Sequence, residues 1–171
     1  GVEGRNGAQL AVERINEEGG VAGRRLELAV ENDENTPEGA MAADEKLLEK
    51  GVVAIIGHMT SSQTLAALPH LKKAETALIS PTASTPLLSG KKDNFFRLNP
   101  ASDKSASLMG RYACEELGSE EAAVIYDGDN EAYALPYARN FLESVEECGG
   151  DTSMRLEFSS NEEVDWRKTA E

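Results

Sequence analysis

Short apolar runs alternate with amphipathic stretches along most of this chain. The runs have the length and composition of buried strands and lie at 52–56, 77–79, 94–98, 122–126 and 152–158. Between and before them, apolar residues recur at helical spacing at 6–18, 36–51, 61–76, 102–117 and 131–148. Strands that alternate with helices predict an α/β fold with a doubly wound parallel sheet.

The ends of the first elements carry local signals. Gly19-Gly20 ends the first helix, and Thr36 with Pro37 begins the second as N-cap and first helical residue. Residues 25–30 alternate between apolar and polar side chains, which predicts a strand with one less buried face. Pro69 either kinks the helix that it lies in or restarts it.

The order of elements predicts two domains. The pattern opens with a helix, whereas a doubly wound domain opens with a strand, so we expect a first strand to be missing or supplied by another segment. The strand–helix pattern starts again after Pro100. We therefore expect residues 1–100 to form a first α/β domain and 101–171 the start of a second, in a fragment without the C-terminal part.

Two clusters of small hydroxyl residues follow neighbouring strands. Thr60-Ser61-Ser62 follows the run at 52–56, and Thr82-Ala83-Ser84-Thr85 follows the run at 77–79. Carboxyl ends of parallel strands meet at one edge of a sheet, where ligands bind in open α/β folds. If Ser61 or Ser62 starts a helix, its free N–H groups make this edge a site for one carboxylate. Ser and Thr in these positions are also common as N-caps and turn formers.

The amino-acid composition limits the kinds of molecule that this protein is expected to bind. The 171 residues carry 17 Lys and Arg against 31 Asp and Glu, for a formal net charge of -14. This charge opposes binding to nucleic acid and to anionic membranes. No apolar run reaches the ~20 residues of a membrane span. No signal peptide precedes Gly1, so any export signal has been removed or lies outside this sequence.

The sequence matches known catalytic and metal-binding motifs poorly. Residues 127–131 (DGDNE) are similar to a calcium loop, but the sixth position is Ala132 where such loops have Gly. His58 and His70 stand at no ligand spacing with Cys or acidic residues, and His58 is interpreted as a residue at the end of the sheet. No glycine-rich phosphate loop or nucleophile elbow is present. We expect a binding protein without cofactor or metal, and not an enzyme.

Several segments in order resemble the periplasmic leucine/isoleucine/valine-binding proteins, the substrate-binding components of branched-chain amino-acid ABC transporters. They are residues 6–16 with Gly19-Gly20, residues 57–64 (GHMTSSQT), 79–86 (ISPTASTP), 96–100 (FRLNP), and 124–127 with Tyr133. The resemblance covers nearly the whole chain. It implies two α/β domains of the periplasmic-binding-protein type I fold that close over a ligand like a hinged shell.

The resemblance also implies the site. It assigns the ligand carboxylate to Ser61, the backbone at Thr82, and Ser84, with Thr60 and Ala83 beside them in the two clusters.

Tyr133 would face the ligand from the second domain, so its replacement by Ala should weaken binding several-fold. Tyr137 is a competitor for that role, because the loop before Tyr133 is slightly long. Tyr133 packed on its own helix is the other interpretation.

The implied function is capture of a small amino acid or similar carboxylate and its delivery to an ABC transporter permease. The implied location is the periplasm or another extracytoplasmic space, with or without a lipid anchor. The alternative is a ligand-sensing domain of the same fold in a membrane receptor or sensor kinase.

Cys114 and Cys148 are left with two interpretations. They could pair only if two helices lie side by side, and free buried thiols are favoured. Members of the resembled family often carry a disulfide near the rim of the first domain. The matching positions here are Asn35 and Thr60, so that bridge is absent.

Overall fold

The computed structural model describes residues 1–169 of the chain. Its helices are α1 (Val2–Glu17), α2 (Pro37–Glu49), α3 (Ser61–Lys73), α4 (Asp103–Arg111), α5 (Glu131–Glu147) and α6 (Trp166–Thr169). Its strands are β1 (Ala54–Ile56), β2 (Ala77–Ser80), β3 (Phe95–Arg97), β4 (Glu121–Asp127) and β5 (Asp151–Phe158). Three short helical turns are η1 (Pro86–Leu88), η2 (Tyr112–Glu116) and η3 (Gly128–Asn130).

The first sheet contains β1, β2 and β3 in that order, and both pairings are parallel. Ile55 pairs with Leu78, and Leu78 pairs with Phe95. The crossover helix α3 places Leu68 and Leu71 in the same buried cluster as Ile55 and Leu78, which fixes α3 against this sheet. We call β1–β3 with α2 and α3 the first sheet unit.

The second sheet contains the parallel pair β4 and β5, with Val124 opposite Arg155. α5 connects the two strands and buries Leu142 and Val145. α4 packs closely on α5 at Gly110, where a Cβ atom would lie 2.4 Å from the carbonyl oxygen of Phe141. A larger residue would push the two helices apart. We call β4 and β5 with α4 and α5 the second sheet unit.

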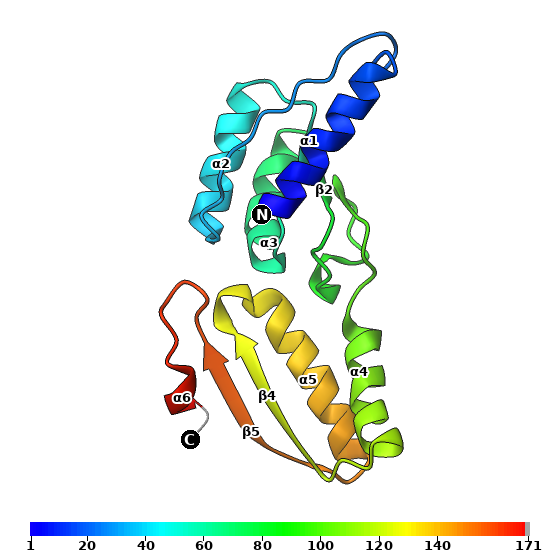
Figure 1. Ribbon diagram of the computed structural model, residues 1–171, viewed down its shortest axis with the longest axis vertical. Helices are drawn as coiled ribbons and strands as arrows, with labels where there is room; N and C mark the ends of the chain where they lie inside the picture. The colour runs from blue at the N-terminus through cyan, green and yellow to red at the C-terminus, as the bar shows by residue number, and fades with distance from the viewer. Residues whose placement is uncertain (170–171) are drawn as a thin grey trace.

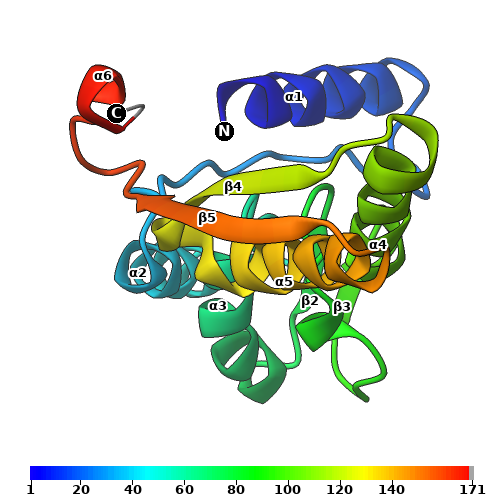
Figure 2. The ribbon, with the colours of Figure 1, turned by 90° about the horizontal axis from the view of Figure 1, so that it is seen from below.

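The two sheet units lie one above the other, joined by the chain between β3 and α4 (Figure 1). The start of α3 meets the start of α5 between them, where the backbone N–H of Ala132 donates to the hydroxyl of Ser62. Figure 2 shows α5 lying along one face of β4 and β5. The interface between the units is therefore built around two helix N-termini.

The predicted α/β class with parallel sheets is confirmed. Thr36 caps α2 as predicted, because its hydroxyl accepts the backbone N–H of Gly39 at 3.0 Å and Pro37 is the first helical residue. α3 begins at Ser61 and continues through Pro69 to Lys73. Local signals of this kind were sufficient to place both helices.

Other boundaries differ from the prediction. The strand predicted at 25–30 does not form, because the Asn16 side chain bonds both backbone groups of Leu26, at 2.7 and 2.9 Å, and no ladder partner runs beside the segment in residues 1–169. The first helix begins at Val2, before the predicted Asn6. The helix predicted over 102–117 is divided, since α4 ends at Arg111 and the π-helical turn η2 follows.

The favoured interpretation of the cysteines is wrong. Cys114 and Cys148 form a disulfide between η2 and the end of α5. The close packing of α4 on α5 brings the two residues side by side, and Cys148 is exposed at the surface. Sequence spacing alone gave no sign of this helix pairing.

Candidate functional site

The two predicted hydroxyl clusters meet at one edge of the first sheet. The backbone N–H of Thr85 donates to the hydroxyl of Ser61 at 3.3 Å, and the hydroxyl of Thr82 donates to the carbonyl of Met59 at 2.5 Å. Ser61 and Thr85 are fully buried, as is Ala83. The expectation that both clusters share this edge agrees with these contacts.

Ser80, at the end of β2, holds the second cluster in place. Its buried hydroxyl donates to the carbonyl of His58 at 2.7 Å and accepts the N–H of Ala83 at 3.0 Å. Ser84 follows, and its carbonyl accepts the N–H of Ser102 at 2.9 Å, close to the connection with the second sheet unit. Sequence reasoning did not single out Ser80, although its place directly after the apolar run 77–79 was a usable signal.

The N-terminus of α3 is already occupied by a side chain from the second sheet unit. The N–H groups of Ser61 and Ser62 both donate to Oδ1 of Asn130, at 3.1 and 3.3 Å. Thr60 is the N-cap residue of α3, yet its side chain makes no capping bond, and its hydroxyl is buried without a hydrogen-bond partner. The donors predicted for an anion are thus present, and they hold an amide oxygen.

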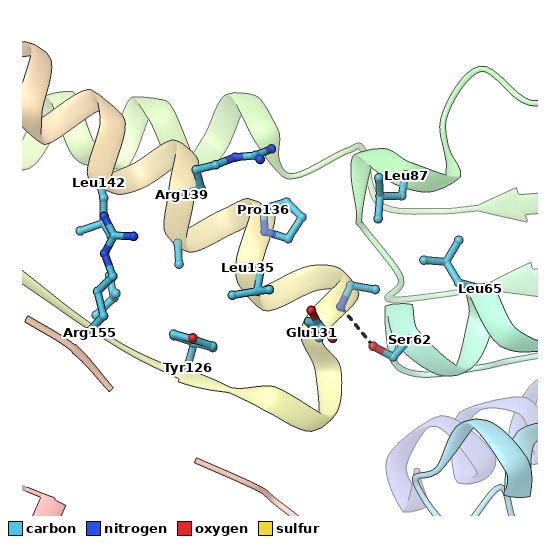
Figure 3. Close-up of a pocket in the computed structure, with 13 residues that line it drawn as sticks. Ser62, Leu65, Leu87, Tyr126, Glu131, Leu135, Pro136, Arg139, Leu142 and Arg155 are labelled. Carbon is cyan, nitrogen blue, oxygen red and sulfur yellow. Dashed lines mark hydrogen bonds between the residues drawn. The ribbon is translucent and has the colours of Figure 1, made fainter. Parts of the chain in front are cut away.

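A pocket of about 670 Å³ opens beside this contact, between the two sheet units (Figure 3). Its lining is mostly apolar, with Leu65 from α3 and Leu87 from η1 facing Leu135 and Pro136 of α5. Charged side chains at its edge are Glu131, Arg139 and Arg155. None of the six predicted site residues lines it, although Ser62, next to Ser61, does.

Tyr133 lies in the first turn of α5, one residue after Ala132. Its ring stacks at a tilt on that of Tyr137, with centroids 5.5 Å apart, and both line a second pocket of about 490 Å³ over β4. Burial raises the pKa of Tyr133. This arrangement fits the interpretation that Tyr133 packs on its own helix, and a ligand contact by Tyr133 or Tyr137 stays a prediction.

His58 follows the end of β1, as interpreted from the sequence, and its side chain is buried between two carboxylates. Its Nδ1 lies 3.0 Å from Asp33 Oδ2 and its Nε2 lies 3.3 Å from Asp44 Oδ2. Burial lowers the pKa of His58, but the hydrogen bonds and charges of both carboxylates outweigh it and raise the pKa to about 9. The hydrogen bond from His58 lowers the pKa of Asp33. A charged imidazole therefore ties the loop at Asp33 to α2.

The acidic loop after β4 is satisfied by its own neighbours. Oδ2 of Asp129 accepts the hydroxyl of Ser159 at 2.8 Å and the N–H of Asn161 at 2.9 Å, and these bonds lower its pKa. Asn161 also bonds Asn35, in the turn before α2, at 3.4 Å. Within residues 1–169, no group of three His, Cys, Asp or Glu side chains is arranged to hold a metal ion.

No helix in the described part of the chain combines the length and the apolar character needed to cross a bilayer.

Comparison with known proteins gives one family. A model of the periplasmic binding protein family matches residues 1–168. The leucine-, isoleucine-, valine-, threonine- and alanine-binding protein of Pseudomonas aeruginosa is 29% identical over 146 residues, which cover 85% of this chain and 39% of that protein.

Solved structures of substrate-binding proteins are similar in fold to this chain. The branched-chain amino-acid transporter substrate-binding protein LivJ of Streptococcus pneumoniae, in complex with isoleucine, has a TM-score of 0.86 at 26% identity, covering 99% of this chain and 48% of that one. An ABC transporter substrate-binding protein of Desulfitobacterium hafniense, in complex with Leu, has a TM-score of 0.70 at 30% identity, covering 92% and 47%. The chain thus spans about two fifths to one half of the length of these relatives.

Proposed function

Because the chain belongs to the periplasmic binding protein family, whose model matches residues 1–168, we propose that it captures a small amino acid or similar carboxylate. The ligand binds between two domains, formed by residues 1–100 and by a second domain that begins at 101. The loaded protein then delivers the ligand to an ABC transporter permease.

The observation that carries this proposal is the meeting of two uncharged hydroxyl clusters at the N-terminus of α3. The N–H of Thr85 donates to the hydroxyl of Ser61 and joins the two clusters, and the hydroxyl of Thr82 donates to the carbonyl of Met59, the residue before the first cluster. The first N–H groups of a helix and its positive dipole end favour a carboxylate. In this proposal Ser61, the backbone at Thr82, and Ser84 hold that carboxylate, with Thr60 and Ala83 beside them.

A binding role suits this edge better than catalysis. His58 lies two residues before Thr60, and both of its ring nitrogens are engaged by buried or partly buried carboxylates. Arg97 donates to the carbonyl of Thr85 at 2.8 Å, and a guanidinium stays protonated and cannot act as a base. A general base needs a free nitrogen within reach of the substrate. Family members are solute-binding proteins, and the proposed site suits that role.

The ligand is proposed to be a small aliphatic amino acid. The Pseudomonas relative is named for such amino acids, and two similar structures hold isoleucine and Leu. The hydroxyl clusters recognise the carboxylate end, which all amino acids share. The side-chain preference therefore needs a direct experiment.

The location is proposed to be extracytoplasmic, as for the family. The disulfide between Cys114 and Cys148 supports this, because disulfides persist in oxidising compartments such as the periplasm.

A thermal-shift screen of the full-length protein tests the function. The panel contains aliphatic amino acids, amides, aromatic acids and sugars, each compared with the same compound as its methyl ester where one exists. We expect a small aliphatic amino acid to raise the melting temperature and its ester to lose most of that effect. Stabilisation only by a sugar or an aromatic acid would refute the amino-acid assignment.

A further inference from the structure

Arg97 is the last residue of β3, and it reaches the second hydroxyl cluster from the neighbouring strand. In the parallel ladder it pairs with Ser80, the last residue of β2, so both residues lie at the edge of the sheet where the clusters meet. Figure 2 shows β2 and β3 side by side. Arg97 belongs to the segment 96–100 (FRLNP), none of whose residues is part of either cluster. A side chain from outside the clusters is therefore in a position to act on them.

The guanidinium of Arg97 binds both ends of the turn that follows the second cluster. Its Nη1 donates to the carbonyl of Thr85 at 2.8 Å, and its Nη2 donates to the hydroxyl of Ser89 at 2.6 Å. Thr85 is the N-cap residue of η1, and Ser89 is its C-cap residue. Both acceptors are neutral oxygens, and the planar fork of a guanidinium holds two acceptors in one fixed geometry. Arg97 therefore fixes the position of η1 at both of its ends.

Thr85 connects Arg97 to the first cluster. Thr85 is fully buried, and its N–H donates to the hydroxyl of Ser61 at 3.3 Å. Its own hydroxyl accepts the N–H of Leu87 at 3.2 Å, so its N–H, carbonyl and hydroxyl are all bonded. A buried residue bonded in this way cannot shift without leaving a polar group unsatisfied. The bond from Arg97 therefore helps to set the place at which the Thr85 N–H meets Ser61.

The direction of the Ser61 hydroxyl follows from this contact. A serine hydroxyl has one hydrogen to donate and rotates to suit its partners. The Thr85 N–H occupies one acceptor position of the Ser61 oxygen, so the hydroxyl hydrogen points away from that N–H. This hydrogen is the one that a ligand carboxylate would accept.

We propose that Arg97 is a positioning residue of the carboxylate site: it fixes η1 and Thr85, and through the Thr85 N–H it orients the Ser61 hydroxyl toward the ligand. Arg97 does not touch the ligand itself. The ligand part of this inference rests on the proposed function. The ordering of η1 by Arg97 rests only on the hydrogen bonds of the guanidinium.

The first experiment measures hydrogen–deuterium exchange in the ligand-free, full-length protein. Arg97→Met removes both donors and keeps a long apolar stem, so the amides within residues 85–89 should exchange roughly 5- to 30-fold faster. Ser89→Ala removes one of the two bonds and should have a smaller effect. Lys92→Met is the matched control, because Lys92 is exposed in the loop before β3 and carries the same charge. Unchanged exchange over 85–89 in Arg97→Met would overturn the proposal.

The second experiment measures affinity by calorimetry on the full-length protein, with leucine, isoleucine and the most stabilising compound of the screen. Arg97→Met should weaken binding roughly 5- to 50-fold, because the Ser61 hydroxyl loses its fixed direction. Arg97→Lys keeps the charge without the fork, so its affinity should lie between those of Arg97→Met and the parent. Lys92→Met should bind like the parent. Parental affinity in Arg97→Lys would show that the charge acts and the geometry does not.

A double-mutant cycle with Ser61→Ala separates positioning from a general loosening of the fold. In the Ser61→Ala background, Arg97→Met should weaken binding by less than about twofold, because the hydroxyl through which Arg97 acts is absent. Equal losses in both backgrounds would contradict the proposed role. If melting curves show that Arg97→Met does not fold, Arg97→Lys replaces it in both experiments. If the parent binds none of these compounds, the proposed function fails, and the exchange measurement alone decides whether Arg97 orders η1.

Discussion

In the proposed carboxylate site, Ser61 is the side chain that we expect to matter most for binding. Its side chain is buried, and its hydroxyl already accepts the N–H of Thr85, so its own hydrogen remains for a ligand oxygen. Ser61→Ala should cost on the order of 1–3 kcal/mol of binding free energy, the value of a hydrogen bond to a charged group. Calorimetry on the full-length protein measures this loss.

Ser119→Ala is the matched control, because Ser119 lies in the turn before β4, at the far end of that strand from Asp127. It should leave affinity unchanged. The melting temperature of each variant separates lost binding from lost folding. Unchanged affinity in a folded Ser61→Ala protein would remove Ser61 from the site.

His58 gives the fold a predictable pH dependence. Its pKa rises from 6.5 to about 9 on folding, so its contribution to stability is complete below pH 6.5 and is lost as the pH rises through 9. At about 1.4 kcal/mol for each unit of pKa, the contribution is roughly 3 kcal/mol. Denaturant unfolding at pH 6, 7.5 and 9.5 should show this decrease.

The His58→Gln variant tests the origin of that decrease. Glutamine can donate one hydrogen bond but carries no titrating charge, so the variant should be less stable at pH 6 and should show a flatter profile. Parallel pH profiles for the two proteins would mean that other groups cause the loss.

Residue-scale features of the site were only partly predictable. The small hydroxyl residues after two strands were visible because a strand end is a local signal in the sequence. Asn130 was not, because an Asn in a loop is an ordinary turn residue and its partner Ser61 lies 69 positions away. The contacts of His58 with Asp33 and Asp44 were missed for the same reason, at separations of 25 and 14 positions.

Elements with capping signals were predictable, and elements that depend on a partner were not. Thr36 and Pro37 fixed the start of α2, whereas the alternation at 25–30 suggested a strand that has no ladder partner within residues 1–169. Alternation describes a surface with one buried face, but only hydrogen bonding to a neighbour makes a strand. The pairing of α4 with α5, and with it the disulfide, could not be read from either helix alone.

We expect the disulfide to contribute a large share of the free energy of unfolding of the second sheet unit. It closes a loop between positions separated by 34 residues, for which the chain-entropy model gives roughly 4 kcal/mol. The double variant Cys114→Ser with Cys148→Ser should lose about 2–4 kcal/mol in urea unfolding. Dithiothreitol should destabilise the parent and leave the variant unchanged, and equal stability of parent and variant would contradict the bridge.

At the scale of the whole molecule, binding should require that two domains enclose the ligand. The residues proposed to bind the ligand from residues 1–100 would contact only its carboxylate end. The chain spans 48% of the length of a similar protein that was solved in complex with isoleucine. In a binding protein whose two domains close over the ligand, much of the affinity comes from excluding water around both charges of the ligand. A single domain cannot exclude this water. We therefore expect the isolated 171-residue chain to show no saturable binding at micromolar amino acid.

Calorimetry of this chain and of the full-length protein under the same conditions makes the comparison, with circular dichroism to establish that the shorter chain is folded. Tight, saturable binding by the isolated chain would show that the two hydroxyl clusters suffice for binding and that a second complete domain is not required.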